Sequence, residues 1–362
     1  MNIVFRLDSS EIIGTGHLMR CLSLANSLKE AGAKCFFVCR DHIGNINEII
    51  KDSSHEAIIL PIKNNNSAHK IRSMPLNYED WLGTTWEIDA DETINSIKEI
   101  LPDWIIIDHY GIDTKWEKLV RPYCRGIFVI DDLANRRHDC DIFLDQNLHT
   151  LGESAYQDLL PLHCTKLLGP KNILIKDDFL SIKPPHTPNE LKHLFVYFGS
   201  YDIYNQAGNA LSAINALPEL TADIVLGKNH PHKEKLVRSS TKRVEVIEHL
   251  DNLGQYMTKA DLSLGSCGVT AWERCALGLP TITCTTADNQ KENAECLHRY
   301  GAIISLGNSA KVTREVWLKE INNLRKDTNT LKMMKIKSLE LVSGYHENKV
   351  RLISKLMNNT YH

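Results

Sequence analysis

A histidine follows a short glycine-rich turn near the start of the chain, in the segment Gly14-Thr15-Gly16-His17. The apolar run Ile3–Leu7 before the turn has strand character, and apolar residues recur at helical spacing after it. Such a strand-to-helix turn opens toward the ligand crevice of an α/β sheet. A histidine there is unusual as mere structure, because it lies where ligands dock. The plain alternative is a turn without chemistry, because a lone Gly-x-Gly is a weak signal.

The same segment argues against two common nucleotide sites. Met19 stands where the Gly-x-Gly-x-x-Gly dinucleotide fingerprint needs its last glycine. No Gly-Lys-Ser/Thr follows to complete a P-loop. A dinucleotide site is therefore disfavoured.

Three further strand-to-helix turns are predicted in the second half, at Phe198–Asp202, Gly265–Glu273 and Thr285–Gln290. Backbone N–H groups at glycine-containing turns of this kind suit a phosphate. Glu273, one turn into its helix, can accept two hydrogen bonds from ribose hydroxyls. It can equally be a first-turn acid that the helix dipole favours. The spacing leaves both interpretations open.

Polar residues also end two strands predicted in the first half. Asp108-His-Tyr110 follows one apolar run, and Asp131-Asp132 follows another. The carboxyl ends of parallel strands are where the sites of α/β proteins lie. Taken singly, each of these residues is more often a helix cap or a solvated loop residue.

Short apolar runs alternate with helical patterns in both halves, as in parallel βα units. The first series of predicted strands is 3–7, 35–38, 57–62, 104–108, 127–130, 142–144 and 166–168. The second series is 194–198, 222–226, 244–247, 262–264, 281–284 and 303–306. We therefore expect the α/β class, with two Rossmann-like domains facing a cleft.

The proline-rich segment Lys183–Pro188 cannot continue a helix or a central strand. We expect a first domain over residues 1–182, a linker over 183–190 and a second domain over 191–345. The tail, 346–362, is expected to form a helix that packs on the first domain.

Composition excludes several functional classes. The formal net charge of −3 gives no general affinity for nucleic acid. No apolar run reaches the ~18 residues of a membrane span, and the start has no secretory layout. The ten cysteines are scattered, mostly in apolar runs, and Cys35 and Cys39 lack a second pair to complete a zinc site. We expect a cytoplasmic protein with reduced thiols and no stable membrane association.

An ordered set of motifs resembles the UDP-sugar hydrolases of pseudaminic acid biosynthesis, which act on UDP-2,4-diacetamido-2,4,6-trideoxy-β-L-altropyranose. The N-terminal signature is Arg6-x-Asp8 with Ile13-Gly-Thr-Gly-His-x-Met-Arg20-Cys. The other matching blocks are Asp80-Trp-Leu-Gly, Asp108-His-Tyr-Gly, Asp131-Asp-Leu-Ala-x-Arg136, Leu144-Asp-Gln-Asn147, Leu168-Gly-Pro170, Trp272-Glu-Arg-Cys-x-Leu-Gly-Leu-Pro280 and Asn289-Gln290. The resemblance spans about residues 1–307 and implies the two-domain GT-B fold of nucleotide-sugar glycosyltransferases such as the MurG group.

The resemblance also implies roles for individual residues. His17 matches the proposed general base, Tyr110 and Asn289 match residues at the sugar or the attacking water, and Glu273 matches a ribose-binding acid. The first domain is then the sugar-binding and catalytic one, and the second binds UDP. The predicted substrate-binding residues are Arg6, Asp8, Gly14, Gly16, Arg20, Gly199, Ser200, Leu250, Cys267, Gly268, Val269, Thr270, Glu273 and Gln290.

The chain departs from the family pattern at the expected pyrophosphate contacts. Ser200 and Tyr201 stand where the family usually has Gly and Ser. Val269 stands where its glycine-rich loop usually has Ser.

The activity implied is hydrolysis of a UDP-2,4-diacetamido-2,4,6-trideoxy hexose of the altrose type. One water attacks the anomeric carbon with inversion, and UDP leaves. Backbone N–H groups at Gly199 and Gly268 can hold the pyrophosphate, so we expect neither a metal nor a cofactor. Three alternatives stay open: a glycosyltransferase on the same scaffold, a hydrolase of a related UDP-diacetamido sugar in another nonulosonic acid pathway, and a non-catalytic nucleotide-sugar-binding protein.

Overall fold

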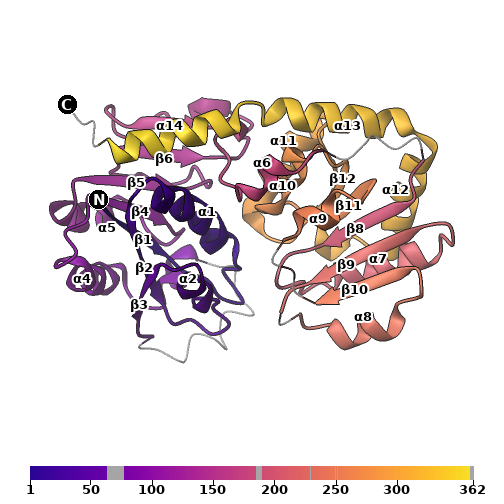
Figure 1. Ribbon diagram of the computed structural model, residues 1–362, viewed down its shortest axis with the longest axis horizontal. Helices are drawn as coiled ribbons and strands as arrows, with labels where there is room; N and C mark the ends of the chain where they lie inside the picture. Colours follow the sequence, from indigo (N-terminus) through magenta and orange to yellow (C-terminus); the bar gives the residue numbers. More distant parts are fainter. Residues whose placement is uncertain (63–76, 185–189, 229, 249, 251, 359–362) are drawn as a thin grey trace. The chain divides into compact units, whose positions relative to one another are not determined.

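The computed structural model describes residues 1–62, 77–184, 190–228, 230–248, 250 and 252–358. The chain forms two compact units, each built on its own sheet (Figure 1). The first unit comprises Met1–Asn147, Leu151–Leu174 and Tyr345–His362, and the second comprises Leu148–Thr150 and Ile175–Gly344. Residues 185–189 of the predicted linker lie outside the described part of the chain.

The first unit is a parallel seven-stranded sheet with strand order β3-β2-β1-β4-β5-β6-β7. Its strands are β1 (Asn2–Leu7), β2 (Lys34–Arg40), β3 (Glu56–Leu60), β4 (Trp104–Asp108), β5 (Gly126–Ile130), β6 (Ile142–Asp145) and β7 (Thr165–Leu168). Its α-helices are α1 (Gly16–Glu30), α2 (Glu48–Asp52), α4 (Trp86–Ile97), α5 (Thr114–Val120) and α14 (Tyr345–Met357). Short 3₁₀ turns are η2 (Tyr78–Leu82), η3 (Arg121–Tyr123), η4 (Gly152–Tyr156) and η5 (Pro170–Asn172).

Both faces of this sheet are covered, which explains why its strands are almost continuously apolar. Successive side chains of a strand point to opposite faces. Ile3 and Phe5 of β1 accordingly join the core beneath α1, whereas Val4 joins the core beneath α4 and α5.

The helix α14 completes the first unit although it comes last in the chain (Figure 1). Its Leu352 and Leu356 are buried in the same core as α1. The indole Nε1 of Trp104 donates to the carbonyl of Leu356 at 3.1 Å, and Lys349 Nζ donates to Ser23 Oγ at 3.0 Å. Apolar burial and these bonds tie the tail to the sheet formed by the start of the chain.

The second unit is a parallel six-stranded sheet with strand order β10-β9-β8-β11-β12-β13. Its strands are β8 (His193–Tyr197), β9 (Thr221–Leu226), β10 (Val244–Glu248), β11 (Leu262–Ser266), β12 (Thr281–Thr285) and β13 (Ile304–Asn308). Its helices are α6 (Asp178–Ser181), α7 (Gln206–Asn215), α8 (Lys233–Ser239), α9 (Gly254–Met257), α10 (Thr270–Ala276), η6 (Asp288–Gln290), α11 (Lys291–Tyr300), η7 (Ser309–Lys311), α12 (Arg314–Lys326) and α13 (Thr328–Leu341).

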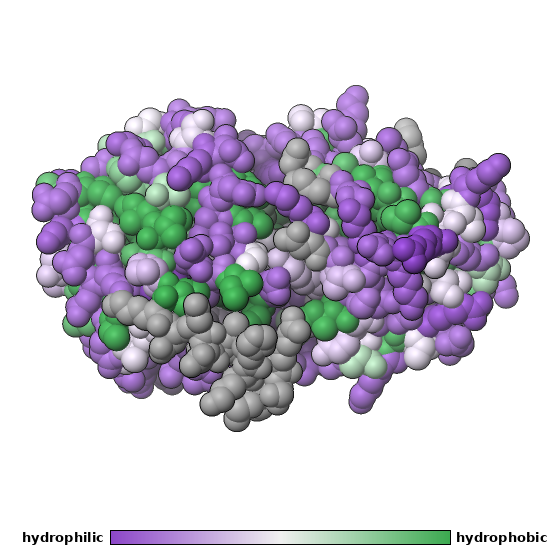
Figure 2. Space-filling model, turned by 90° about the horizontal axis from the view of Figure 1, so that it is seen from below, coloured by the Kyte–Doolittle hydropathy of each residue, from purple (hydrophilic) through white to green (hydrophobic). Residues whose placement is uncertain are grey.

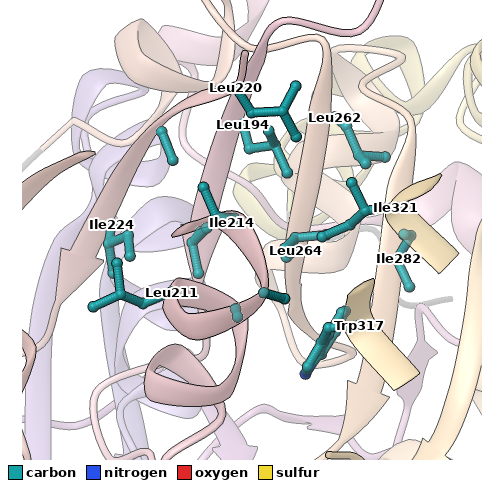
Figure 3. Close-up of a cluster of buried hydrophobic side chains, with 14 of the residues drawn as sticks. Leu194, Leu211, Ile214, Leu220, Ile224, Leu262, Leu264, Ile282, Trp317 and Ile321 are labelled. Carbon is teal, nitrogen blue, oxygen red and sulfur yellow. The ribbon is translucent and has the colours of Figure 1, made fainter. Parts of the chain in front are cut away.

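The core of the second unit lies where side chains of the central strands meet those of α7 and α12 (Figure 3). Trp317 of α12 is fully buried there, and its Nε1 donates to Gln206 Oε1 at 2.8 Å. Every strand predicted from the sequence is present, and the predicted α/β class is confirmed.

In each sheet, the first strand marks the point where the strand order switches sides. Strands on one side of it come next in the chain, and strands on the other side come later. β1 lies between β2 and β4, and β8 lies between β9 and β11. In open parallel sheets, ligands bind beyond the carboxyl ends of the strands at such a switch point. The loops after β1, β4, β8 and β11 are therefore the places to look for a site.

The border between the units falls at Leu174, before the domain end placed at residue 182 from the proline cluster. The following residues pack within the second unit. The Cδ1 atom of Ile182 lies so close to Gly254 that a Cβ on that glycine would come within 2.5 Å of it.

No helix in the described part of the chain combines the length and the apolar character needed to cross a bilayer. On the face shown in Figure 2, hydrophilic residues predominate, and hydrophobic residues form separate groups.

Candidate functional site

The loop between β1 and α1 is built around a tight turn at Gly14. The Gly14 N–H donates to the carbonyl of Ser10 at 2.8 Å, and Gly14 has a φ of +80°. A side chain at Gly14 would meet no atom within 4 Å, so the requirement for glycine comes from the backbone conformation and not from space. Gly16 then begins α1, which places His17 in the first turn of the helix.

His17 is paired with a carboxylate that the sequence analysis did not assign to it. The Nδ1 atom of His17 lies 2.6 Å from Oδ1 of Asp108, the last residue of β4. Asp108 reaches this position because it is the register partner of Leu7, at the end of β1. An ionised carboxylate accepts the proton of Nδ1–H and so leaves Nε2 of the neutral ring as an acceptor.

Arg20, one turn further along α1, holds the same carboxylate. Its Nε and Nη2 atoms lie 2.6 Å from Oδ2 and Oδ1 of Asp108, and Cys21 Sγ donates to Oδ2 at 3.3 Å. Burial by itself raises the pKa of Asp108, but the charges of Arg20 and then His17 outweigh burial and hold that pKa well below its usual range. Asp108 is therefore ionised at neutral pH.

A second carboxylate, Asp132, holds Tyr110. The phenol of Tyr110 donates to Oδ1 of Asp132, and Asn147 Nδ2 donates to Oδ2 at 2.8 Å. Burial, reinforced by two neighbouring carboxylates, raises the pKa of Asp132 to about 6, although Arg20 opposes the shift. The Arg20 Nη1 atom lies 4.0 Å from Asp132 Oδ2 and so connects the two carboxylates.

Three aromatic rings form a cluster beside the imidazole. The ring of Tyr110 meets the ring of His17 edge-on, with centroids 4.7 Å apart. Trp81 lies 5.3 Å from Tyr110 and 6.1 Å from His17 between ring centroids. Tyr78 completes the group at 5.0 Å from Trp81. The contact with Tyr110 and the hydrogen bond to Asp108 hold the imidazole in place, as a general base requires.

Arg6 and Asp8, predicted to bind substrate, are fully buried. Arg6 donates to Asp8 at 2.7 Å and to Asp89 at 2.6 Å, and the Arg40 N–H donates to Asp8 Oδ1 at 2.6 Å. The guanidinium and the carboxylates thus neutralise one another beneath the loop. Their placement supports the backbone after β1, and neither side chain reaches the surface.

The loop after β8 holds Gly199 and Ser200, two of the predicted nucleotide contacts. Gly199 has a φ of +90°. The Ser200 backbone passes so close to Gly227 that a Cβ there would lie 2.4 Å from the Ser200 carbonyl oxygen. Asp202 then accepts hydrogen bonds from the N–H groups of the first turn of α7, including that of Gln206 at 2.9 Å.

The loop after β11 is shaped by a buried arginine, Arg274. Its guanidinium donates to the carbonyls of Ser266 and Thr270, the latter at 3.1 Å. Gly265 leaves room for it, since a Cβ at that position would lie 2.1 Å from Arg274 Nη1. The two carbonyls flank the loop through Cys267, Gly268 and Val269, so their hydrogen bonds to Arg274 support the conformation of that loop.

Glu273 is half-buried on α10, and its Oε2 atom is enclosed without a hydrogen-bond partner in the described part of the chain. Burial raises the pKa of Glu273 to about 7, although Lys176 and Arg274 oppose the shift. A buried acceptor left without a donor costs about 1–3 kcal/mol. Such an acceptor suits the hydroxyl groups of a ligand.

The remaining predicted residues follow β12 or β10. Gln290 accepts from the Thr286 N–H at 3.0 Å, and its Nε2 lies 3.6 Å from where a Cβ on Gly268 would be. The loops after β11 and β12 therefore meet. Asn289 is half-buried beside Gln290 in η6, and Leu250 is half-buried between β10 and α9.

The predicted residues thus fall into two groups. His17, Arg20 and Tyr110 gather in the first unit, whereas Gly268, Glu273, Asn289 and Gln290 belong to the second. Sequence reasoning missed the roles of Asp108, Asp132 and Trp81. All three stand in blocks that resemble the family, and Asp108 and Asp132 also lie at the ends of predicted strands. Among the described residues, no three or more His, Cys, Asp or Glu side chains form a group that could hold a metal ion.

Comparison with known proteins identifies related sequences. Residues 200–357 match the family model "Glycosyltransferase family 28 C-terminal domain". An uncharacterised protein of Methanocaldococcus jannaschii is 25% identical over 308 residues, covering 81% of this chain, which spans only 57% of that relative's length. The UDP-2,4-diacetamido-2,4,6-trideoxy-β-L-altropyranose hydrolase of Campylobacter jejuni is 25% identical over 305 residues, or 83% of this chain and 97% of the relative.

Solved structures show which fold the two units represent. The crystal structure of MurG from Acinetobacter baumannii matches with a TM-score of 0.63 at 14% identity, over 99% of this chain and 100% of that one. At this identity the likeness shows the fold alone. The chain has the GT-B fold, as predicted.

Proposed function

We propose that this protein is a hydrolase that releases UDP from a UDP-2,4-diacetamido-2,4,6-trideoxy hexose of the altrose type. The pairing of His17 with Asp108 carries the proposal. An imidazole backed by an ionised carboxylate and packed against Tyr110 is the arrangement of a general base, and simple binding of a nucleotide sugar requires none. The identity to the Campylobacter jejuni hydrolase along most of both chains supports the choice of substrate.

In the proposed reaction, Nε2 of His17 takes a proton from water as the water attacks the anomeric carbon. Asp108 stabilises the imidazolium that forms, because the two groups are 2.6 Å apart and Asp108 is ionised. The phenol of Tyr110, whose proton is held by Asp132, presents its oxygen as an acceptor and helps to orient the water. Attack by a single water inverts the anomeric configuration.

The second unit supplies the nucleotide site in this proposal. Glu273 accepts from the ribose hydroxyls, and the turns at Gly199 and Gly268 hold the pyrophosphate through backbone N–H groups. Asn289 is assigned to the sugar or the attacking water. UDP is already a good leaving group, so holding its charge and placing the water are the main tasks.

A second candidate is a glycosyltransferase that uses a UDP-sugar donor. The match of residues 200–357 to a glycosyltransferase family favours it. The same base would then remove the proton of an acceptor hydroxyl instead of water.

One experiment separates the two functions. The purified protein is incubated with UDP-2,4-diacetamido-2,4,6-trideoxy-β-L-altropyranose and no acceptor, UDP is measured, and the sugar product is followed by NMR from the first turnovers. We expect UDP and a free sugar of inverted anomeric configuration. Release of UDP only after an acceptor is added would point to the transferase instead.

Replacing Glu273 with glutamine should weaken UDP binding by about tenfold or more, because a charge-assisted hydrogen bond is worth about 1.5–3 kcal/mol. Calorimetry with UDP measures this. The matched control is Glu295→Gln, an exposed acid on α11, which should leave the affinity unchanged. Equal affinities in the two variants would remove Glu273 from the ribose site.

The same substitution should stabilise the unliganded protein above pH 7. The pKa of Glu273 is raised from 4.5 to about 7, so the folded state binds a proton more tightly than the unfolded state. Stability therefore falls as the pH rises from about 4.5 to 7, and glutamine removes this loss. Thermal unfolding at pH 5 and pH 8 should show a gain only at the higher pH.

A further inference from the structure

Trp81 has a buried hydrogen-bond donor that meets no acceptor among the described residues. Its side chain belongs to η2, the residue is 8% exposed, and its Nε1 atom is enclosed without a partner in the described part of the chain. A buried donor left unpaired costs about 1–3 kcal/mol. Buried polar groups are almost always paired, so this exception requires an explanation.

Three other buried indoles are paired within the fold. Trp104 Nε1 donates to the carbonyl of Leu356 at 3.1 Å, Trp116 Nε1 to Asp89 at 3.0 Å, and Trp317 Nε1 to Gln206 at 2.8 Å. The fold thus supplies acceptors for indoles with a structural role. Trp81 differs from them in lying against the candidate base, with its ring centroid 6.1 Å from that of His17.

The charges around His17 and Tyr110, the ring neighbours of Trp81, limit what the Trp81 donor can bind. Arg20 is already engaged by Asp108, and Asp132 adds a second carboxylate next to the same guanidinium. With both carboxylates ionised, this group has a net negative charge, which disfavours a phosphate or a carboxylate. A neutral carbonyl oxygen is the acceptor that fits.

The surrounding rings add a second requirement. Tyr78 lies 5.0 Å and Tyr110 lies 5.3 Å from Trp81 between ring centroids. Aromatic rings of this kind favour contact with an apolar group. A ligand group with one neutral acceptor and one methyl group satisfies both the indole N–H and the rings, whereas a hydroxyl satisfies only the N–H.

We propose that Trp81, with the rings of Tyr78 and Tyr110, forms a subsite for an N-acetyl group of the sugar. The indole Nε1–H donates to the acetyl carbonyl, and the methyl group packs on the rings. This inference rests on the proposed function and adds to it a residue that selects acylated amino sugars. Because the group lies beside His17, binding of the acetyl group also places the sugar relative to the base.

The test compares Trp81→Phe with the unmodified protein on three UDP-sugars. One is the 2,4-diacetamido-2,4,6-trideoxy substrate, and the other two carry a hydroxyl in place of one acetamido group, at C2 or at C4. For the diacetamido substrate, Trp81→Phe should lower kcat/KM by about 10- to 100-fold, because a buried carbonyl loses its donor. For one of the two hydroxyl analogues, the same substitution should change kcat/KM less than threefold.

That pattern is a double-mutant cycle between the protein and the substrate. It identifies which acetyl group Trp81 binds, since only the analogue lacking that group becomes insensitive to the substitution. UDP affinity should not change, because the nucleotide is assigned to the other unit. Trp86→Phe is the control; Trp86 is a half-buried indole at the start of α4, and its replacement should leave all three values unchanged.

An equal loss on all three substrates would show that Trp81 merely supports the site, and the inference would be wrong. The inference would also be wrong if Trp81→Phe lowered kcat/KM for none of the three substrates. Failure of the proposed function has a different signature: the unmodified protein would release no UDP from any of the three sugars, although it bound UDP.

Discussion

Replacing His17 with glutamine should lower the rate of UDP release by two to four orders of magnitude, the usual contribution of a general base. Glutamine keeps a polar side chain of similar reach, but it cannot take a proton. Its amide N–H can still donate to Asp108, so the packing around Asp108 and Arg20 should change little. The measurement is kcat with saturating UDP-sugar and no acceptor, together with calorimetry for UDP.

UDP affinity should be the same in His17→Gln as in the unmodified protein, because the loops to which we assign the nucleotide belong to the other unit. His163→Gln serves as the control, since the side chain of His163 is 61% exposed and lies away from the cluster around Asp108. Its activity should be unchanged. If His17→Gln keeps most of the hydrolysis rate, another group is the base.

Replacing Asp108 with asparagine should have a comparable effect on rate, about 10²–10⁴-fold, through its action on His17. Asparagine removes the charge that stabilises the imidazolium. Its amide N–H can also donate to Nδ1 of His17, which would make Nδ1 the acceptor of the neutral ring and leave Nε2 protonated. The variant should also be less stable by up to about 3–5 kcal/mol, because the buried Arg20 loses both of its 2.6 Å contacts with a carboxylate and keeps only Asp132, at 4.0 Å. Kinetics and thermal unfolding measure the two effects separately.

A double variant, Arg20→Met with Asp108→Asn, distinguishes catalysis from folding. Removing both charges should restore much of the stability, because the uncompensated guanidinium is gone. The rate should stay low, since the imidazole still lacks its carboxylate. Recovery of the rate together with the stability would mean that Asp108 serves only to hold the structure.

The sequence predicted several residues of the His17 site individually, but it did not predict that they lie together. His17 was singled out because a glycine turn precedes it, and Tyr110 through the family resemblance and its place at a strand end. Their packing, with ring centroids 4.7 Å apart, follows from the position of β1 beside β4 in the sheet. That adjacency is a property of strand order, which no local pattern contains.

Buried charges show a different limit of sequence reasoning. Arg6 and Asp8 were assigned to the substrate through the family resemblance, as part of its N-terminal signature. In the structure, Arg6 is bonded to Asp89, which is 83 residues away along the chain. An arginine that binds a substrate and one that neutralises a buried carboxylate look the same until the distant partner is located.

The sequence by itself determined the elements and the class of this protein. Strands buried on both faces appear in the sequence as apolar runs, and the helices between them show apolar residues at helical spacing. Glycines mark the turns after β1, β8 and β11. These patterns together predicted two units, each with a parallel sheet. Only the tertiary structure decided which charges meet. His17 and Asp108 are 91 residues apart, and Leu7 and Asp108 are brought side by side by the register of two strands. Strand order and register depend on the packing of whole sheet faces, and together they brought the imidazole to its carboxylate.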